Sequence, residues 1–128
     1  MIPPRAFIFD AYGTLFDVHS IAMLAETLVP TQGGALSRIW RTKQLEYTWL
    51  SSLMISPSQP REDFAAITAH ALEYAVAQLM APIDAAGRQQ LLDAYRHLAP
   101  FPDAHDALAA LAPRPRWILS NGSLAMLE

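Results

Sequence analysis

Two short apolar runs, one near each end of the chain and each followed by turn-forming residues, place the strongest constraint on the fold. Residues 5–10 (RAFIFD) lead into 12–14 (YGT), and residues 116–120 (RWILS) lead into 121–123 (NGS). Brief, continuous runs of aromatic and β-branched residues are typical of parallel strands buried on both faces. We therefore expect two parallel strands whose carboxyl ends meet at one edge of a sheet, where ligands of α/β proteins bind.

The long stretch between these runs has little strand character, and prolines and glycines divide it into helices. We expect helices over about 20–29, 36–54, 60–80, 84–97 and from 103 to just before Pro113. Pro30 and the Gly33-Gly34 pair would separate the first two, Pro60 would lie in the first turn of the third, and Asp84 would cap the fourth. The fifth helix suffices as a crossover between parallel strands. Residues 1–15 and 101–128 are therefore predicted to form an α/β core, and residues 16–100 a helical cap over the strand ends.

The composition limits the classes of partner. The chain has 128 residues, 52% of them hydrophobic, which is ample for a packed core. Its net charge of −3 gives no basic footprint for nucleic acid and no polybasic segment for a membrane surface. Cysteine is absent, which excludes disulfides and thiolate sites. With no apolar run long enough for a signal peptide or a membrane span, we expect a soluble cytoplasmic protein.

Asp10 follows the first predicted strand and opens the segment DAYGTL at 10–15. A carboxylate at the tip of a buried strand is held rigidly and partly desolvated, which suits a nucleophile. Gly13 permits a sharp turn that brings backbone N–H groups towards a bound anion, and Thr14 is placed to hydrogen-bond the carboxylate. Taken alone, Asp10 is equally compatible with an aspartate that caps a turn. Ser120, at the same edge of the predicted sheet, favours a functional site.

These segments resemble the haloacid dehalogenase superfamily. Residues 9–17 (FDAYGTLFD) match its first motif, and residues 119–122 (LSNG) match its second. The resemblance implies a Rossmann-like α/β core with a parallel sheet and a helical-bundle cap insertion. It also implies a nucleophile at Asp10 and a contact with the substrate anion at Ser120.

Tyr12 occupies a position that separates activities within this superfamily. Phosphatases usually carry a second aspartate there, which protonates an alcohol leaving group. A tyrosine does not readily replace that acid, whereas a halide leaving group needs no proton. The departure therefore favours cleavage of a carbon–halogen bond.

A helical segment at 40–49 (WRTKQLEYTW) supplies a cation. Its spacing puts Arg41, Leu45 and Thr48 on one helix face. A helical arginine is in general a solvated surface charge. This segment, however, resembles the cap helix of the L-2-haloacid dehalogenases, which implies that Arg41 and Asn121 hold the leaving halide while Leu45 contacts the carbon chain of the substrate.

The resemblance further implies a two-step hydrolysis of L-2-haloalkanoic acids. Asp10 displaces the halide from C2 to give an ester, and water then releases a D-2-hydroxy acid. Ser120 and the backbone N–H groups of Ala11 and Tyr12 hold the substrate carboxylate, and Phe64 forms an aromatic wall of the halide pocket. No metal or cofactor is expected, because the substrate is a monoanion. Such relatives are commonly homodimers through their cap helices.

The sequence departs from the superfamily after the second motif. The third motif supplies a lysine and the fourth an acid, but Lys43 is the only lysine here and Glu128 the only acid after Ser120. Two strands alone would also leave sheet edges and faces uncovered. We therefore expect these residues to correspond to a little over half of a complete enzyme. Two other interpretations stay open: a magnesium-dependent phosphatase or phosphonatase of the superfamily, and a non-catalytic truncated fragment.

Overall fold

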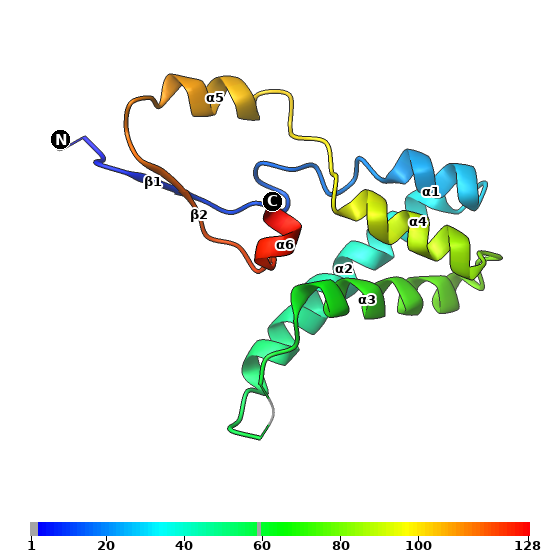
Figure 1. The fold of residues 1–128 in the computed structure, drawn as a ribbon. Helices are drawn as coiled ribbons and strands as arrows, with labels where there is room; N and C mark the ends of the chain where they lie inside the picture. The colour runs from blue at the N-terminus through cyan, green and yellow to red at the C-terminus, as the bar shows by residue number, and fades with distance from the viewer. Residues whose placement is uncertain (1–2, 59) are drawn as a thin grey trace.

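The computed structural model describes residues 3–58 and 60–128 of the chain. In chain order its elements are β1 (Phe7–Phe9), α1 (Ala22–Leu28), α2 (Gly33–Leu53), α3 (Phe64–Leu79), α4 (Ala85–Tyr95), α5 (Ala104–Ala110), β2 (Arg116–Ile118) and α6 (Leu124–Leu127). Figure 1 shows α1 to α4 gathered on one side and β1, β2 and α5 on the other. We refer to residues 16–100, which contain α1 to α4, as the helical segment. The short helix α6 was not expected from the sequence.

The two strands pair in parallel, as predicted, with Phe9 opposite Ile118. Leu119 continues the pairing by donating its N–H to the carbonyl oxygen of Phe9 at 2.9 Å. Helix α5 lies between the helical segment and β2 in chain order and provides the crossover (Figure 1). The carboxyl ends of both strands therefore lie side by side, which brings residues 10–15 next to residues 120–123.

The expectation that both strands are buried on two faces is wrong for this structure. Ile8 is 68% exposed, Trp117 63% and Leu119 73%. Within the described residues the sheet consists of β1 and β2 alone. A sheet of two strands has too few neighbouring elements to cover its faces, so apolar side chains of the strands remain in contact with water.

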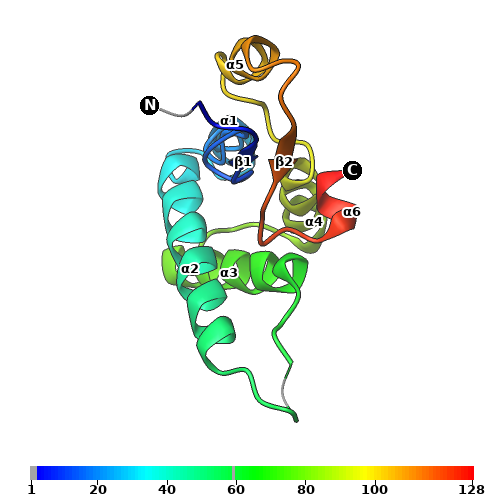
Figure 2. The ribbon, with the colours of Figure 1, turned by 90° about the vertical axis from the view of Figure 1, so that its left-hand side faces the viewer.

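The hydrophobic core lies instead among the helices of the helical segment. Leu36 and Trp40 of α2, Leu72 of α3 and Leu91 of α4 are almost completely buried there. The indole N–H of Trp40 also donates to the carbonyl oxygen of Thr68 at 2.8 Å, which ties α2 to α3. Figure 2 shows α3 lying across α2. The core is thus formed mainly by the helices, with Ala11 and Tyr12 of the turn after β1 packed into it.

Contrary to expectation, the Gly33-Gly34 pair does not separate two helices, because α2 begins at Gly33. A Cβ atom on Gly33 would lie 2.1 Å from the backbone nitrogen of Glu26. Helices α1 and α2 therefore approach closely only because this residue has no side chain. Glu26 Oε2 also accepts the Gly33 N–H at 2.8 Å, which places a negative charge at the α2 N-terminus. The glycine serves helix packing here, not helix termination.

Aspartates cap the starts of α3 and α4. The prediction for Asp84 is confirmed, since its Oδ1 accepts the Gly87 N–H at 2.8 Å. Helix α3 begins at Phe64, later than the expected start at Pro60. Asp63 has an extended backbone (φ −63°, ψ 140°), and its side chain accepts a hydrogen bond from the first turn. This cap makes Phe64 the first residue of α3.

Candidate active site

A cavity of about 100 Å³ lies where the strand ends meet the helical segment. Side chains from well-separated parts of the chain line it: Asp10, Tyr12, Arg41, Leu45, Thr48, Phe64, Ser120 and Asn121. All the residues predicted for the site, except Ala11 and Thr14, therefore border one space. Those two residues belong to the turn that follows β1.

Asp10 lies directly after β1, and its side chain is exposed. Thr14 Oγ1 donates to Asp10 Oδ2 at 3.2 Å, as the sequence predicted. The expected desolvation of the carboxylate is not observed, because the sheet is open to solvent on the face that carries Ile8. The carboxylate is thus oriented by Thr14 and accessible from the cavity.

The turn after β1 is closed by Gly13, whose φ of 97° lies in the left-handed region. The carbonyl oxygen of Ala11 accepts the Leu15 N–H at 2.9 Å inside this turn. Gly13 donates its own N–H to the carbonyl oxygen of Phe16 at 2.8 Å. The sharp turn is confirmed, but the Gly13 N–H is used within it and is not available to an anion. This leaves the amides of Ala11 and Tyr12 as the backbone donors of interest.

Tyr12 lines the cavity and is almost fully buried. Its ring stacks on that of Tyr95 with centroids 5.8 Å apart, and its centroid lies 5.3 Å from that of Phe64. Its hydroxyl donates to the carbonyl oxygen of Met126 at 3.1 Å. Burial, with a contribution from Tyr95, raises the pKa of the Tyr12 phenol above its ordinary value. The phenol is therefore neutral and its proton is directed to the backbone, unlike that of a general acid facing a leaving group.

Arg41 reaches from α2 to the turn after β1. Its Nη2 donates to the carbonyl oxygen of Tyr12 at 2.8 Å, and its Nη1 donates to Gln44 Oε1 at 2.8 Å. Leu45 and Thr48 line the same cavity, as their helical spacing predicted. The guanidinium is thus fixed in the cavity wall and is not a free surface charge.

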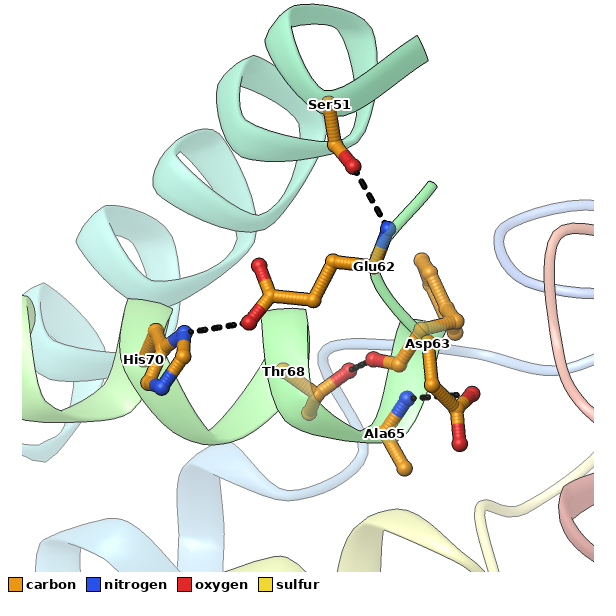
Figure 3. A network of polar contacts seen from close by, with 7 residues as sticks. Ser51, Glu62, Asp63, Ala65, Thr68 and His70 are labelled. Atoms are coloured by element: carbon orange, nitrogen blue, oxygen red, sulfur yellow. Dashed lines mark hydrogen bonds and ion pairs between the residues drawn. The ribbon is translucent and has the colours of Figure 1, made fainter. Parts of the chain in front are cut away.

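A network of polar contacts surrounds the start of α3, where Phe64 is the first residue (Figure 3). The Glu62 N–H donates to Ser51 Oγ at 2.9 Å, and the Glu62 carboxylate pairs with His70 Nδ1 at 3.1 Å. Inside the first turn, Thr68 Oγ1 donates to the carbonyl oxygen of Phe64 at 2.7 Å. These contacts attach the loop before α3 to both α2 and α3, and so fix the aromatic ring at the cavity.

Ser120 and Asn121 follow β2 and line the cavity from the strand side. Ser120 Oγ accepts the Gly122 N–H at 3.1 Å, and Asn121 Oδ1 accepts from Arg61 Nη2 at 2.6 Å. A guanidinium only donates hydrogen bonds, so this contact turns the amide oxygen towards Arg61 and leaves the NH₂ group on the other side. The strand end therefore offers a hydroxyl and an amide donor.

Several residues that support the site were not identified from the sequence. Gln44 stands three positions after Arg41, and this helical spacing was a usable signal. Arg61 approaches Asn121 through the loop before α3, and Tyr95 approaches through α4. No local sequence pattern predicts the contacts of Arg61 and Tyr95, because they depend on how the helices pack.

A larger cavity, of about 540 Å³, lies beside α2 and the loop before α3. Its charged residues, Arg61 and Glu62, already contact Asn121 and His70.

Across 3–58 and 60–128, no group of three or more histidine, aspartate or glutamate side chains is arranged to hold a metal ion. In that same part of the chain, every helix is too short or too polar to cross a membrane. The smaller cavity is therefore the candidate active site.

No family model matches the chain. The curated proteins similar to it include several (S)-2-haloacid dehalogenases. The chain is 44% identical over 126 residues to the (S)-2-haloacid dehalogenase of Pseudomonas putida, an alignment that covers 97% of this chain and 54% of the relative. It is 44% identical over 124 residues to the (S)-2-haloacid dehalogenase of Xanthobacter autotrophicus, with 97% and 47% covered.

Solved structures give the same result. The L-2-haloacid dehalogenase of Xanthobacter autotrophicus superposes with a TM-score of 0.85 at 45% identity, covering 96% of this chain and 49% of that one. The structure of that protein with chloropropionic acid covalently bound also gives a TM-score of 0.85, at 44% identity and the same coverage. The chain therefore has their α/β fold with an incomplete core. The resemblance to the L-2-haloacid dehalogenases is thereby confirmed, for a chain that spans about half the length of the curated relatives it matches.

Proposed function

We propose that this chain supplies the nucleophile and the halide pocket of a hydrolase acting on L-2-haloalkanoic acids. The observation that carries the proposal is the convergence of Asp10, Arg41 and Asn121 on one cavity. A carboxylate, a cation and an amide donor are the groups needed to attack a carbon atom and to receive the anion that leaves it. The names of the relatives, and the chloropropionic acid bound covalently in one of them, indicate the substrate class.

In the first step, an oxygen of Asp10 attacks C2 of the substrate from the side opposite the halogen. The new C–O bond forms as the carbon–halogen bond breaks, and the halide leaves with the bonding electrons. Water then adds to the carbonyl carbon of the aspartyl ester, and the bond from that carbon to the ester oxygen breaks, so that the oxygen that attacked C2 leaves with the product. The carboxylate is regenerated, one proton is released, and the product is a D-2-hydroxy acid.

The halide and the substrate carboxylate need separate sets of donors. We assign the halide to Arg41, which acts through its charge, and to the NH₂ group of Asn121. We assign the carboxylate to Ser120 and to the backbone N–H groups of Ala11 and Tyr12. This division gives the halide and the substrate carboxylate different donor groups.

The remaining predicted residues shape the space around C2. Leu45 and Phe64 present apolar surface to the cavity, which would exclude water from the leaving group and contact the carbon chain. Thr14 holds one oxygen of Asp10 and so orients the nucleophile. Reaction by this route requires no metal, since the substrate is a monoanion and no phosphate charge has to be neutralised.

Tyr12 supports halide release over phosphate ester hydrolysis. Its phenol is buried, has a raised pKa and donates to the carbonyl oxygen of Met126. An alcohol leaving group would need a proton from this position, whereas a halide does not. A magnesium-dependent phosphatase or phosphonatase is therefore the weaker candidate.

The division of the chain belongs to the same proposal. We assign residues 1–15 and 101–128 to the Rossmann-like core and residues 16–100 to a cap that covers the active site. We also propose a cytoplasmic homodimer joined through helices of the cap. The exposed apolar side chains at the end of α2, which include Trp49 and Leu53, support that interface.

Chloride release from L- and D-2-chloropropionate, with and without EDTA, tests the activity. Because the chain spans about half the length of its relatives, the assay compares it with a chimera in which it replaces the matching segment of the Pseudomonas putida relative. We expect the chimera to release chloride from the L isomer only, unaffected by EDTA. Removing the nucleophile in Asp10→Asn should slow release by about a thousandfold or more.

Asp106→Asn, which makes the same change at an exposed aspartate of α5, serves as the matched control and should retain the rate of the chimera. Chloride release that survives in Asp10→Asn would contradict the assignment of the nucleophile. Magnesium-dependent release of phosphate from p-nitrophenyl phosphate, without chloride release, would establish the phosphatase alternative instead.

A further inference from the structure

Gln44 is a fully buried amide whose polar atoms all have partners. Its side chain is 0% exposed in the middle of α2. Its Oε1 accepts from Arg41 Nη1 at 2.8 Å and from the hydroxyl of Tyr95 at 2.8 Å, and its Nε2 donates to Thr68 Oγ1 at 2.6 Å. A buried amide whose oxygen and nitrogen both have partners is fixed in orientation, and here the oxygen faces the guanidinium.

These hydrogen bonds connect the two cap residues assigned to the halide pocket. From Gln44 the contacts run to Arg41 on α2 in one direction, and through Thr68 to the carbonyl oxygen of Phe64 on α3 in the other. Tyr95 joins the same group from α4 and stacks on the ring of Tyr12. One amide therefore fixes side chains from three helices relative to one another and to the turn after β1.

Two donors of Arg41 are already occupied. Nη1 faces Gln44 and Nη2 faces the carbonyl oxygen of Tyr12, which fixes both ends of the guanidinium plane. An arginine held in this way does not have to lose rotamer freedom when an anion arrives, so its charge is preorganised. These two bonds use two of the five N–H donors of the guanidinium, and the side chain lines the cavity.

The chemical identity of the acceptor matters as much as its position. A carboxylate at position 44 would form an ion pair with Arg41 and cancel much of the positive charge that attracts a halide. The neutral oxygen of Gln44 orients the guanidinium and leaves its charge intact. An apolar residue of similar volume would fill the space without orienting the cation.

We propose that Gln44 is the positioning residue of Arg41, holding the guanidinium at the halide pocket through a neutral acceptor so that its charge remains available to the anion. This proposal rests on the proposed role of Arg41 in halide binding. Gln44 acts through Arg41 and does not itself touch the substrate.

Two measurements on the 128-residue chain test the proposal. The first is the order of the Arg41 side chain, followed through its Nε–Hε signal in proton–nitrogen NMR spectra without any ligand. The second is the affinity for chloride, followed through the line width of chlorine NMR spectra with sodium chloride as the probe. Circular dichroism shows in each case whether the variant is folded.

Gln44→Met keeps the volume and removes the acceptor. We expect the Arg41 Nε–Hε signal to become mobile and the chloride affinity to fall about tenfold, the effect of one hydrogen bond to a charged group. Gln44→Glu should abolish chloride binding at neutral pH and restore it in acid, where the protonated carboxyl is again a neutral acceptor. A purely structural role would also give this recovery, but only together with loss of the fold at neutral pH and its return in acid, because an ionised carboxylate is costly to bury. The proposal instead predicts that circular dichroism shows a folded Gln44→Glu variant at both pH values.

Gln90→Glu adds the same charge at an exposed position of α4 and should leave chloride binding unchanged. If Gln44→Met does not fold, Tyr95→Phe removes one donor to the same oxygen, and we expect a partial loss of Arg41 order and a chloride affinity about threefold lower.

The possible failures are distinguishable. The positioning role is overturned if Gln44→Met keeps an ordered Arg41 and an unchanged chloride affinity. If Gln44→Met does not fold, the same result in Tyr95→Phe overturns it. In both cases the halide assignment still stands. Chloride binding that persists in Arg41→Met, or that is absent from the unmodified chain, overturns the halide assignment and with it this proposal.

Discussion

At the scale of single residues, Asn121 is the side chain whose chemistry depends most on a neighbour. An asparagine amide can offer an anion either its NH₂ donors or its repelling oxygen, and the two arrangements differ only by rotation of the amide. The hydrogen bond from Arg61 Nη2 to Asn121 Oδ1 selects the arrangement with the oxygen turned away. Arg61 therefore sets the amide orientation that the proposed halide site requires, although it lies outside the smaller cavity.

We expect Arg61→Met to lower the chloride affinity of the chain about threefold, because the amide of Asn121 is then free to turn its oxygen towards the cavity. The chlorine NMR titration used for Gln44 measures this. Arg114→Met removes the same charge at an exposed position near the opposite end of β2 and should leave the affinity unchanged. An equal loss in both variants would assign the effect to net charge and contradict the contact-based explanation.

The sequence predicted some of the site residues from position alone. Asp10 and Ser120 were placed together because both follow strands whose carboxyl ends meet at one edge of the sheet. Arg41 required the resemblance to the L-2-haloacid dehalogenases, since a helical arginine is otherwise assigned to the surface. The contact of Arg61 with Asn121 could not be predicted from the sequence, because it joins residues 60 positions apart and Arg61 lies in an irregular loop.

At the scale of the elements, the join between α1 and α2 shows why local signals are ambiguous. Glycine pairs usually end helices, and on that basis Gly33-Gly34 was predicted to separate the first two. In the structure Gly33 is buried against the backbone of Glu26, and the pair opens α2. The positions of prolines, glycines and aspartates predicted the ends of α1 to α5 to within a few residues. The role of a particular glycine, however, depends on the helix packed against it.

This contact predicts effects of opposite sign at neighbouring positions. Gly33→Ala would place a Cβ atom 2.1 Å from the backbone nitrogen of Glu26, so α1 and α2 must separate. We expect the free energy of unfolding to fall by about 2 kcal/mol or more. Gly34→Ala would meet only the end of Arg38, at 3.8 Å, and should raise it by about 0.5–1 kcal/mol. Urea denaturation measures both, and changes of the same sign would contradict this reading of the helix contact.

At the scale of the whole molecule, two groups of exposed apolar side chains stand out among the described residues. One is the sheet, with Ile8 and Trp117, where burial was predicted from a continuous apolar run. That prediction failed because a run of apolar residues shows what a strand is suited to, not whether neighbouring elements are present to cover it. The other is the end of α2 and the residues after it, with Trp49, Leu50, Leu53, Met54 and Ile55, which we call the α2 apolar end.

The proposed homodimer predicts that the α2 apolar end lies in the interface. We expect the chain to sediment as a dimer, and Leu53→Glu to convert it to a monomer, because a charge would be buried in an apolar contact. Met23→Glu places the same charge at an exposed methionine of α1 and should leave the dimer intact. Sedimentation velocity distinguishes these results. A dimer that survives Leu53→Glu, or one that is lost in Met23→Glu, would locate the interface elsewhere.

The hydrogen bond between Arg41 and the carbonyl oxygen of Tyr12 has a thermodynamic consequence for the molecule as a whole. It links the helical segment to the turn that follows Asp10, the proposed nucleophile, through the same guanidinium that lines the cavity. An anion that favours this position of Arg41 must also favour the docked arrangement of the two parts, by an equal free energy in both directions. A bound halide would then stabilise the docking of the helical segment on the strands, and its departure would weaken that docking.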